Sequence, residues 1–91
     1  MGQDERSLAA AAYNTCWDLL EQAPGDARDR NLVSAAFESR FHWSLVGGAQ
    51  ELAIADWMVS RASAATGNPR LAVLFAESAL AQLQDDFPHW L

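Results

Sequence analysis

Three interruptions divide this chain into four helix-forming stretches, and they constrain its fold more than any other feature. The interruptions are Ala23-Pro24-Gly25, Gly47-Gly48 and Gly67-Asn68-Pro69. Proline lacks the backbone N–H that a helix needs, and glycine tolerates the left-handed exit from a helix. Between them, alanine is the commonest residue and favours helix. The sequence therefore predicts an all-α fold of about four antiparallel helices, over roughly 5–22, 29–46, 49–66 and 69–86.

Apolar residues recur at three- and four-residue steps in every stretch, as they do in a helix that buries one face. Asp4 or Ser7 is expected to cap the first helix and Asp29 the second. The two middle helices carry a further apolar row, so we expect them to lie centrally. The expected core face of the fourth helix comprises Ala72, Phe75, Ala76, Ala79, Leu80 and Leu83.

A chain of 91 residues suffices for one domain and is too short for two, so 1–91 is expected to be a single helical domain. Short connections between the stretches predict two stacked helical hairpins. The sequence leaves two arrangements of these hairpins open, a tandem stack and a four-helix bundle. Segments 36 residues apart, such as those around Ala36 and Ala72, hint at an internal repeat.

The charged residues exclude several functions. Twelve are acidic and six are basic, and all six basic residues are arginine. Without lysine, the chain has no Walker-type phosphate loop, Schiff-base lysine or kinase lysine. A net charge of −6 argues against nucleic acid as a partner, since phosphate binding requires basic side chains. The acidic surface is expected to keep the domain soluble.

Cysteine usage and hydropathy indicate a cytoplasmic protein. Cys16 is the single cysteine, so no internal disulfide can form, and no zinc-binding spacing of Cys or His is present. No run approaches 18 consecutive apolar residues, and the first residues, MGQDERS, do not resemble a signal peptide, so no membrane association is predicted. Abundant alanine and arginine without lysine suggest a GC-rich bacterial genome.

The segment ADWMVSRASAATGNPRLAVLFAESAL resembles a tetratricopeptide-repeat (TPR) hairpin, with Gly67 at the turn and Ala62, Ala72 and Ala79 at small positions. Together with SRFHWSLVG before it, the region also resembles a group of bacterial TPR-like proteins without assigned chemistry. The resemblance implies an interaction module of helical hairpins and no catalytic residue. Members of that group continue with a further helix, so this chain is expected to be either a short member or a fragment of a longer array.

Four polar residues of the middle stretches are candidates for a site. Glu38 and His42 lie four positions apart, on one helical turn, and so could share a metal ion or a hydrogen bond. Asp56 and Arg61 lie in the least polar stretch, where unpaired charges are costly, and Arg61 can stack on Trp57. We predict a structural network of His42, Asp56 and Arg61.

An alternative to that network is a small-ligand or metal site in a pocket around Glu38, His42 and Arg61, with further metal ligands from Asp56, His89 or Cys16. No catalytic constellation is predicted, which favours a non-enzymatic protein. No cofactor or resident metal is expected either.

The carboxyl-terminal part of the chain supplies the predicted interaction surface. Leu71 and Leu74 lie beside the expected core face of the fourth helix, so they are expected to remain partly uncovered. Large apolar residues at the end of the chain either fold back on the helices or meet another chain. The predicted function is protein interaction or self-association as a homodimer, through Leu71, Leu74, Phe87, Trp90 and Leu91.

Overall fold

The computed structural model describes residues 4–86, with side chains as far as Leu83. This part of the chain forms four α-helices and no strand, which confirms the predicted fold class. None of the helices within 4–86 is both long and apolar enough to cross a membrane. The helices are α1 (Glu5–Leu20), α2 (Asp26–Val46), α3 (Ala49–Ala65) and α4 (Pro69–Asp86).

The first two helices differ from the expected boundaries. Asp4 caps α1 as predicted, because its Oδ1 accepts a hydrogen bond from the Ser7 backbone N–H at 2.7 Å, which also lowers the pKa of Asp4. Helix α1 ends at Leu20, two residues before the expected end. The prediction that Asp29 caps the second helix is wrong. Helix α2 begins at Asp26, and the Asp29 N–H already donates a helical bond to the carbonyl of Gly25 at 2.8 Å.

Arg28 joins the start of α2 to the end of α1. Its side chain is buried in the first turn of α2, 3.0 Å from the Asp29 carboxylate. It also donates a hydrogen bond to the carbonyl of Leu19 at 3.4 Å, close to the end of α1. A guanidinium there offsets the partial negative charge that gathers at a helix carboxyl terminus. The turn between the helices is therefore held by a residue inside α2.

The connection between α3 and α4 is built as the sequence predicts. Gly67 adopts the left-handed conformation, with φ 81°, and the Asn68 N–H donates to the carbonyl of Ser63 at 2.8 Å. The Asn68 side chain accepts from the Leu71 N–H at 3.2 Å, and Pro69 is the first residue of α4. All the information for this turn lies within a few adjacent residues.

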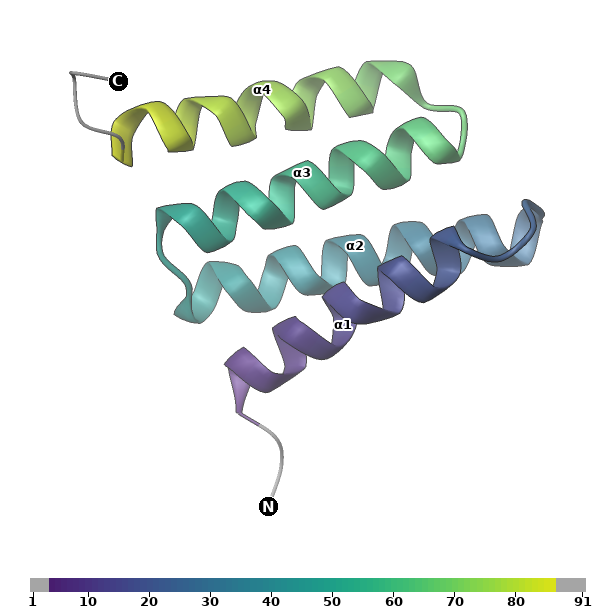
Figure 1. Ribbon diagram of the computed structural model, residues 1–91, viewed down its shortest axis with the longest axis horizontal. Helices are drawn as coiled ribbons and strands as arrows, with labels where there is room; N and C mark the ends of the chain where they lie inside the picture. The colour runs from purple at the N-terminus through teal and green to yellow at the C-terminus, as the bar shows by residue number, and fades with distance from the viewer. Residues whose placement is uncertain (1–3, 87–91) are drawn as a thin grey trace.

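The helices lie in a row, each antiparallel to the one before it (Figure 1). Helix α3 packs on both α1 and α2, and α4 packs on α3. Helix α4 also reaches α2 through the edge-to-face contact of Phe75 with Phe37, whose ring centroids are 5.6 Å apart. Within the described residues α1 and α4 do not pack together, so the row is not closed into a bundle. The result is a flat molecule of 44 × 39 × 17 Å.

The core lies where α3 meets the first two helices. Small residues allow the helices to approach closely: the Ser39 hydroxyl of α2 donates to the carbonyl of Ala9 in α1, and Ser60 of α3 donates to the carbonyl of Ala72 in α4. Burial of each large apolar side chain contributes about 1.5–3 kcal/mol. The central cluster comprises Cys16, Leu19, Leu32, Ala35, Ala36, Met58, Val59 and Ala62.

Candidate functional site

Asp56 is a fully buried carboxylate that joins three helices. Its Oδ1 accepts a hydrogen bond from Arg40 of α2. Its Oδ2 accepts from the Ser78 hydroxyl and from Gln82 Nε2 of α4, each at 2.6 Å. Both carboxylate oxygens are thus occupied by the protein itself. Asp56 has an architectural role in this fold and offers no exposed oxygen to a ligand.

His42 forms a separate polar contact at the other side of α2. Its Nδ1 lies 2.5 Å from Oε2 of Glu5, the first residue of α1. The Phe41 ring meets the imidazole edge-on, with centroids 5.3 Å apart. The imidazole is largely buried, so this pair fastens the start of α1 to α2.

Arg61 is exposed, and its guanidinium lies beside two indole rings that also contact each other, with centroids 6.0 Å apart. Its guanidinium carbon is 5.1 Å from the ring centroid of Trp17 in α1 and 5.6 Å from that of Trp57 in α3. Stacking of a cation on indole is worth about 0.5–1 kcal/mol at an exposed site. The expected stacking of Arg61 on Trp57 is therefore present, with Trp17 as an additional partner that links α1 to α3.

The predicted network of His42, Asp56 and Arg61 is wrong, because the structure gives each of them a different partner. Arg40 is the residue that sequence reasoning missed. Arg40 lies between Phe37 and Phe41 in the sequence, and a charged residue in an apolar stretch indicates that its side chain has a charged or polar partner. Its guanidinium also lies over the Phe75 ring, 5.4 Å from the centroid.

The structure does not gather the residues of the alternative ligand or metal site. Among the described residues no group of three His, Cys, Asp or Glu side chains is close enough to hold a metal ion. Glu38 is exposed, and His42 pairs with Glu5 instead of Glu38. Burial raises the pKa of the Cys16 thiol to about 11, with the Glu38 carboxylate adding to the effect. His89 lies outside the described residues.

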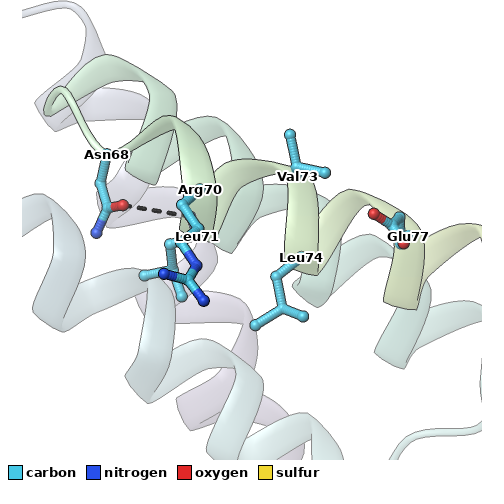
Figure 2. A pocket seen from close by; sticks show the side chains of 6 residues that line it. All are labelled: Asn68, Arg70, Leu71, Val73, Leu74 and Glu77. Carbon is cyan, nitrogen blue, oxygen red and sulfur yellow. Dashed lines mark hydrogen bonds between the residues drawn. The ribbon is translucent and has the colours of Figure 1, made fainter.

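Helix α4 exposes an apolar surface. Residues at steps of three and four share one side of a helix, so Arg70, Val73, Leu74 and Glu77 form one face, which we call the α4 stripe. Val73 is 57% exposed and Leu74 60%. Figure 2 looks onto this face. Val73 projects toward one edge of the face, and Leu71 and Leu74 project toward the other. Asn68 and Leu71 complete a shallow hollow of about 670 Å³.

The predicted interaction residues fall on both sides of the described boundary. Leu74 belongs to the α4 stripe, and Leu71, which is partly buried, lines its hollow. Phe87, Trp90 and Leu91 lie outside the described residues.

A further apolar surface is a hollow of about 360 Å³ between α3 and α4, which we call the α3–α4 groove. Three of its large side chains are at least 40% exposed: Ile54 (50%), Trp57 (42%) and Leu80 (60%). The expectation that Leu80 belongs to the core is wrong, because no helix within 4–86 covers this side of α4. Every lining residue is apolar: Ala53, Ile54, Trp57, Ala76, Ala79, Leu80 and Leu83.

Comparisons with protein-family models, with curated proteins and with solved structures find no match for this chain. Of the polar side chains singled out in the sequence, His42, Asp56 and Arg61 contact other helices and Glu38 is exposed, whereas large apolar side chains of α3 and α4 face outward. Helix α2 also exposes large apolar side chains, at Phe37, Phe41 and Leu45, so uncovered apolar surface occurs on α2, α3 and α4.

Proposed function

We propose that this protein is a non-enzymatic protein-interaction module of tandem helical hairpins, similar to tetratricopeptide repeats, which self-associates through the α4 stripe. The observation that carries the proposal is the pair of exposed side chains Val73 and Leu74 at the centre of the stripe. Exposed apolar groups that are contiguous and flanked by charge are typical of protein contact sites.

The charges of the α4 stripe are complementary to a second copy of the same stripe. Arg70 and Glu77 are equally distant from the midpoint between Val73 and Leu74. When two α4 helices pack antiparallel about a two-fold axis through that midpoint, each Arg70 faces the partner's Glu77. Within residues 4–83 no carboxylate pairs with Arg70 in the single chain. A homodimer would therefore supply the carboxylates that these guanidinium groups lack.

The size of the stripe limits the strength of the dimer. Stable interfaces bury about 800 Å² on each partner, which takes roughly 20–30 residues. The α4 stripe presents four residues, and the hollow beside it adds Asn68 and Leu71. We therefore expect a weak dimer whose population rises with protein concentration, instead of an obligate one.

Sedimentation equilibrium over a concentration series tests this proposal. The weight-average mass of the unsubstituted chain should rise with concentration toward that of two chains. Leu74→Glu should keep the chain monomeric, because it places a carboxylate at the two-fold axis. Leu45→Glu is the matched control, since Leu45 is similarly exposed but lies on α2. It should dimerise like the unsubstituted chain.

A pair of charge-swap variants distinguishes the proposed antiparallel packing from non-specific association. Arg70→Glu should weaken the dimer by placing two carboxylates opposite each other, and Arg70→Glu with Glu77→Arg should restore it. A mass of one chain at every concentration up to the millimolar range would contradict self-association. Equal weakening by Leu74→Glu and Leu45→Glu would contradict the assignment to the stripe.

A further inference from the structure

A further hollow, of about 250 Å³, lies where the first three helices meet, and we call it the aromatic pocket. It is lined by Tyr13 of α1, Trp43 of α2, and Glu51 and Ile54 of α3. Three of these side chains offer rings or aliphatic surface, and the fourth offers a carboxylate. Pockets for drug-sized ligands occupy roughly 300–1,000 Å³, so the aromatic pocket suits a smaller group.

The connection between α2 and α3 brings the indole and the carboxylate of this pocket together. Trp43 lies in the last turn of α2 and Glu51 in the first turn of α3. Gly47 lies between them, because a Cβ atom there would be 3.2 Å from Cε3 of the indole and 2.8 Å from the Cβ of Glu51. The face of an indole and a carboxylate both attract a cation. The local sequence thus builds a setting that favours positive charge.

The chain itself places a cation beside these two groups. The guanidinium carbon of Arg6 is 5.3 Å from the ring centroid of Trp43, and its Nη1 is 3.7 Å from Oε1 of Glu51. Its Nη2 also donates a hydrogen bond to the carbonyl of Val46 at 3.2 Å. The Arg6 side chain is nevertheless 58% exposed, and ion pairs at such exposed positions are weak. A second cation could therefore displace this guanidinium.

We propose that the aromatic pocket binds an alkyl chain that ends in a guanidinium group, which displaces the guanidinium of Arg6 from Trp43 and Glu51. The alkyl chain then lies against Tyr13 and Ile54. A planar guanidinium can stack on an aromatic ring and pair with a carboxylate, and its aliphatic stem can cover apolar surface. The ligand is either a free alkylguanidinium compound or the arginine side chain of a peptide, which share this chemistry.

The charge of the pocket decides against other ligand classes. An anion would be repelled by Glu51 and by the net charge of −6. A neutral apolar group would take up the hollow without using the carboxylate at its edge. All four lining residues belong to α1, α2 and α3. This inference therefore does not depend on the dimer proposed for the α4 stripe.

An NMR titration of the full chain with n-butylguanidinium tests the proposal. The indole N–H resonance of Trp43 and the methyl resonances of Ile54 should shift and reach saturation, whereas the methyl resonances of Val73 in the α4 stripe should not move. The neutral isostere n-butylurea and the anion pentanoate should cause no saturable shift at the same concentrations. A titration with acetyl-Ala-Arg-Ala-amide then distinguishes the two sources: binding as tight as that of n-butylguanidinium indicates a peptide arginine, and weaker binding indicates a free compound.

Two variants test the roles of Arg6 and Glu51. Arg6→Gln should tighten the binding of n-butylguanidinium, because it removes the competing guanidinium of the chain. Arg30→Gln is the matched control, since it removes the same charge from an exposed position about 20 Å along α2 from Trp43, and it should leave the affinity almost unchanged. Glu51→Gln should weaken binding about fivefold. Glu21→Gln, which neutralises an exposed acid at the other end of α1, should not.

Equal binding of n-butylguanidinium and n-butylurea would overturn the proposal, because the pocket would then recognise only the apolar part of the ligand. Equal effects of Arg6→Gln and Arg30→Gln would overturn the displacement of Arg6. Absence of any shift at Trp43 and Ile54 would exclude this pocket as the site. Since the ligands are compared on the unsubstituted chain, a poorly folded variant does not affect that outcome.

Discussion

Asp56 has no exposed surface, and each of its oxygens receives a hydrogen bond from another helix. A buried charge without partners would cost several kcal/mol, so these donors are a condition for placing a carboxylate in α3. Arg40 comes from α2, and Ser78 and Gln82 come from α4. The carboxylate therefore fixes the position of α4 relative to both central helices.

Asp56→Ala should lower the free energy of unfolding by about 3 kcal/mol, because it leaves the partly buried Arg40 without its carboxylate. Chemical denaturation monitored by circular dichroism measures this change. Glu38→Ala is the control, since Glu38 is exposed, and it should change stability by no more than about 0.5 kcal/mol. Equal stabilities of the two variants would show that the contacts of Asp56 contribute little.

The buried thiol of Cys16 makes stability depend on pH in the alkaline range. Its pKa is raised from an ordinary value of 9.0 to about 11, so the folded chain keeps this proton after the unfolded chain has lost it. The folded state then binds more protons, and the free energy of unfolding should fall as pH rises from 9 toward 11. Below pH 9 the contribution of Cys16 is constant.

Denaturation of the unsubstituted chain and of Cys16→Ala at pH 8, 9, 10 and 11 isolates the effect of Cys16. The stability difference between the two proteins should shrink as pH rises, because only the unsubstituted chain has the thiol. A difference that stays constant across this range would contradict the raised pKa.

Polar contacts differ in how far the sequence predicts them. The caps formed by Asp4 and Asn68 join residues three positions apart, so local sequence suffices to identify them. Glu5 and His42 are 37 positions apart, and Arg40 and Asp56 are 16 apart. Such pairs depend on how one helix is rotated and shifted against another. A single sequence does not contain that register, and the predicted network failed for this reason.

At the level of elements, the tight connection between α2 and α3 depends on Gly47. A Cβ atom placed there would lie 2.8 Å from the Cβ of Glu51 and 2.9 Å from the carbonyl oxygen of Trp43. A Cβ at the neighbouring Gly48 would meet only the flexible end of Glu51, at 3.8 Å. Two adjacent glycines thus have different importance, although the sequence presents them alike.

Gly47→Ala should destabilise the protein by about 1–3 kcal/mol, because the backbone of α2 or α3 must move to admit the methyl group. Gly48→Ala should be close to neutral, within about 0.5 kcal/mol. Thermal unfolding of both variants provides the comparison. A Gly48 variant as unstable as the Gly47 variant would show that both positions need glycine for another reason.

The number and order of the helices were predictable, because Pro24-Gly25, Gly47-Gly48 and Gly67-Asn68-Pro69 interrupt a strong helical pattern. The exposure of Leu80 could not be predicted from the sequence. Helical spacing places Leu80 near Ala76 and Leu83, and all three look like core residues in the sequence. Which part of an apolar side is covered depends on the neighbouring helices, and in the described part of the chain α4 has one neighbour along its length, α3.

At the level of the whole molecule, α2 and α3 are the helices with neighbours on both sides. Met58, Val59 and Ala62 lie at the centre of the core cluster and are almost completely buried. Among the helices of residues 4–86, α1 and α4 each have one side without a neighbouring helix. Local opening requires the least loss of buried surface at the ends of the row.

Native-state hydrogen exchange should therefore show the strongest protection for the backbone amides of residues 58–62 in α3. Amides in the first two turns of α1 should exchange much faster, because α1 packs on the row from one side only. Exchange followed by NMR at a single temperature and pH resolves these groups. Uniform protection from α1 to α4 would indicate that the row opens as one unit.

Because α3 rests on the pair of helices before it, the architecture has a direction in which it can be lengthened. A further hairpin packed beside α4 would meet the apolar groove of α3 and α4, which no helix within 4–86 covers. A hairpin added before α1 would have to cover Asn14, Thr15 and Asp18, and would require those residues to change first. Extension of this protein, by natural duplication or by engineering, is therefore far easier at one end than at the other.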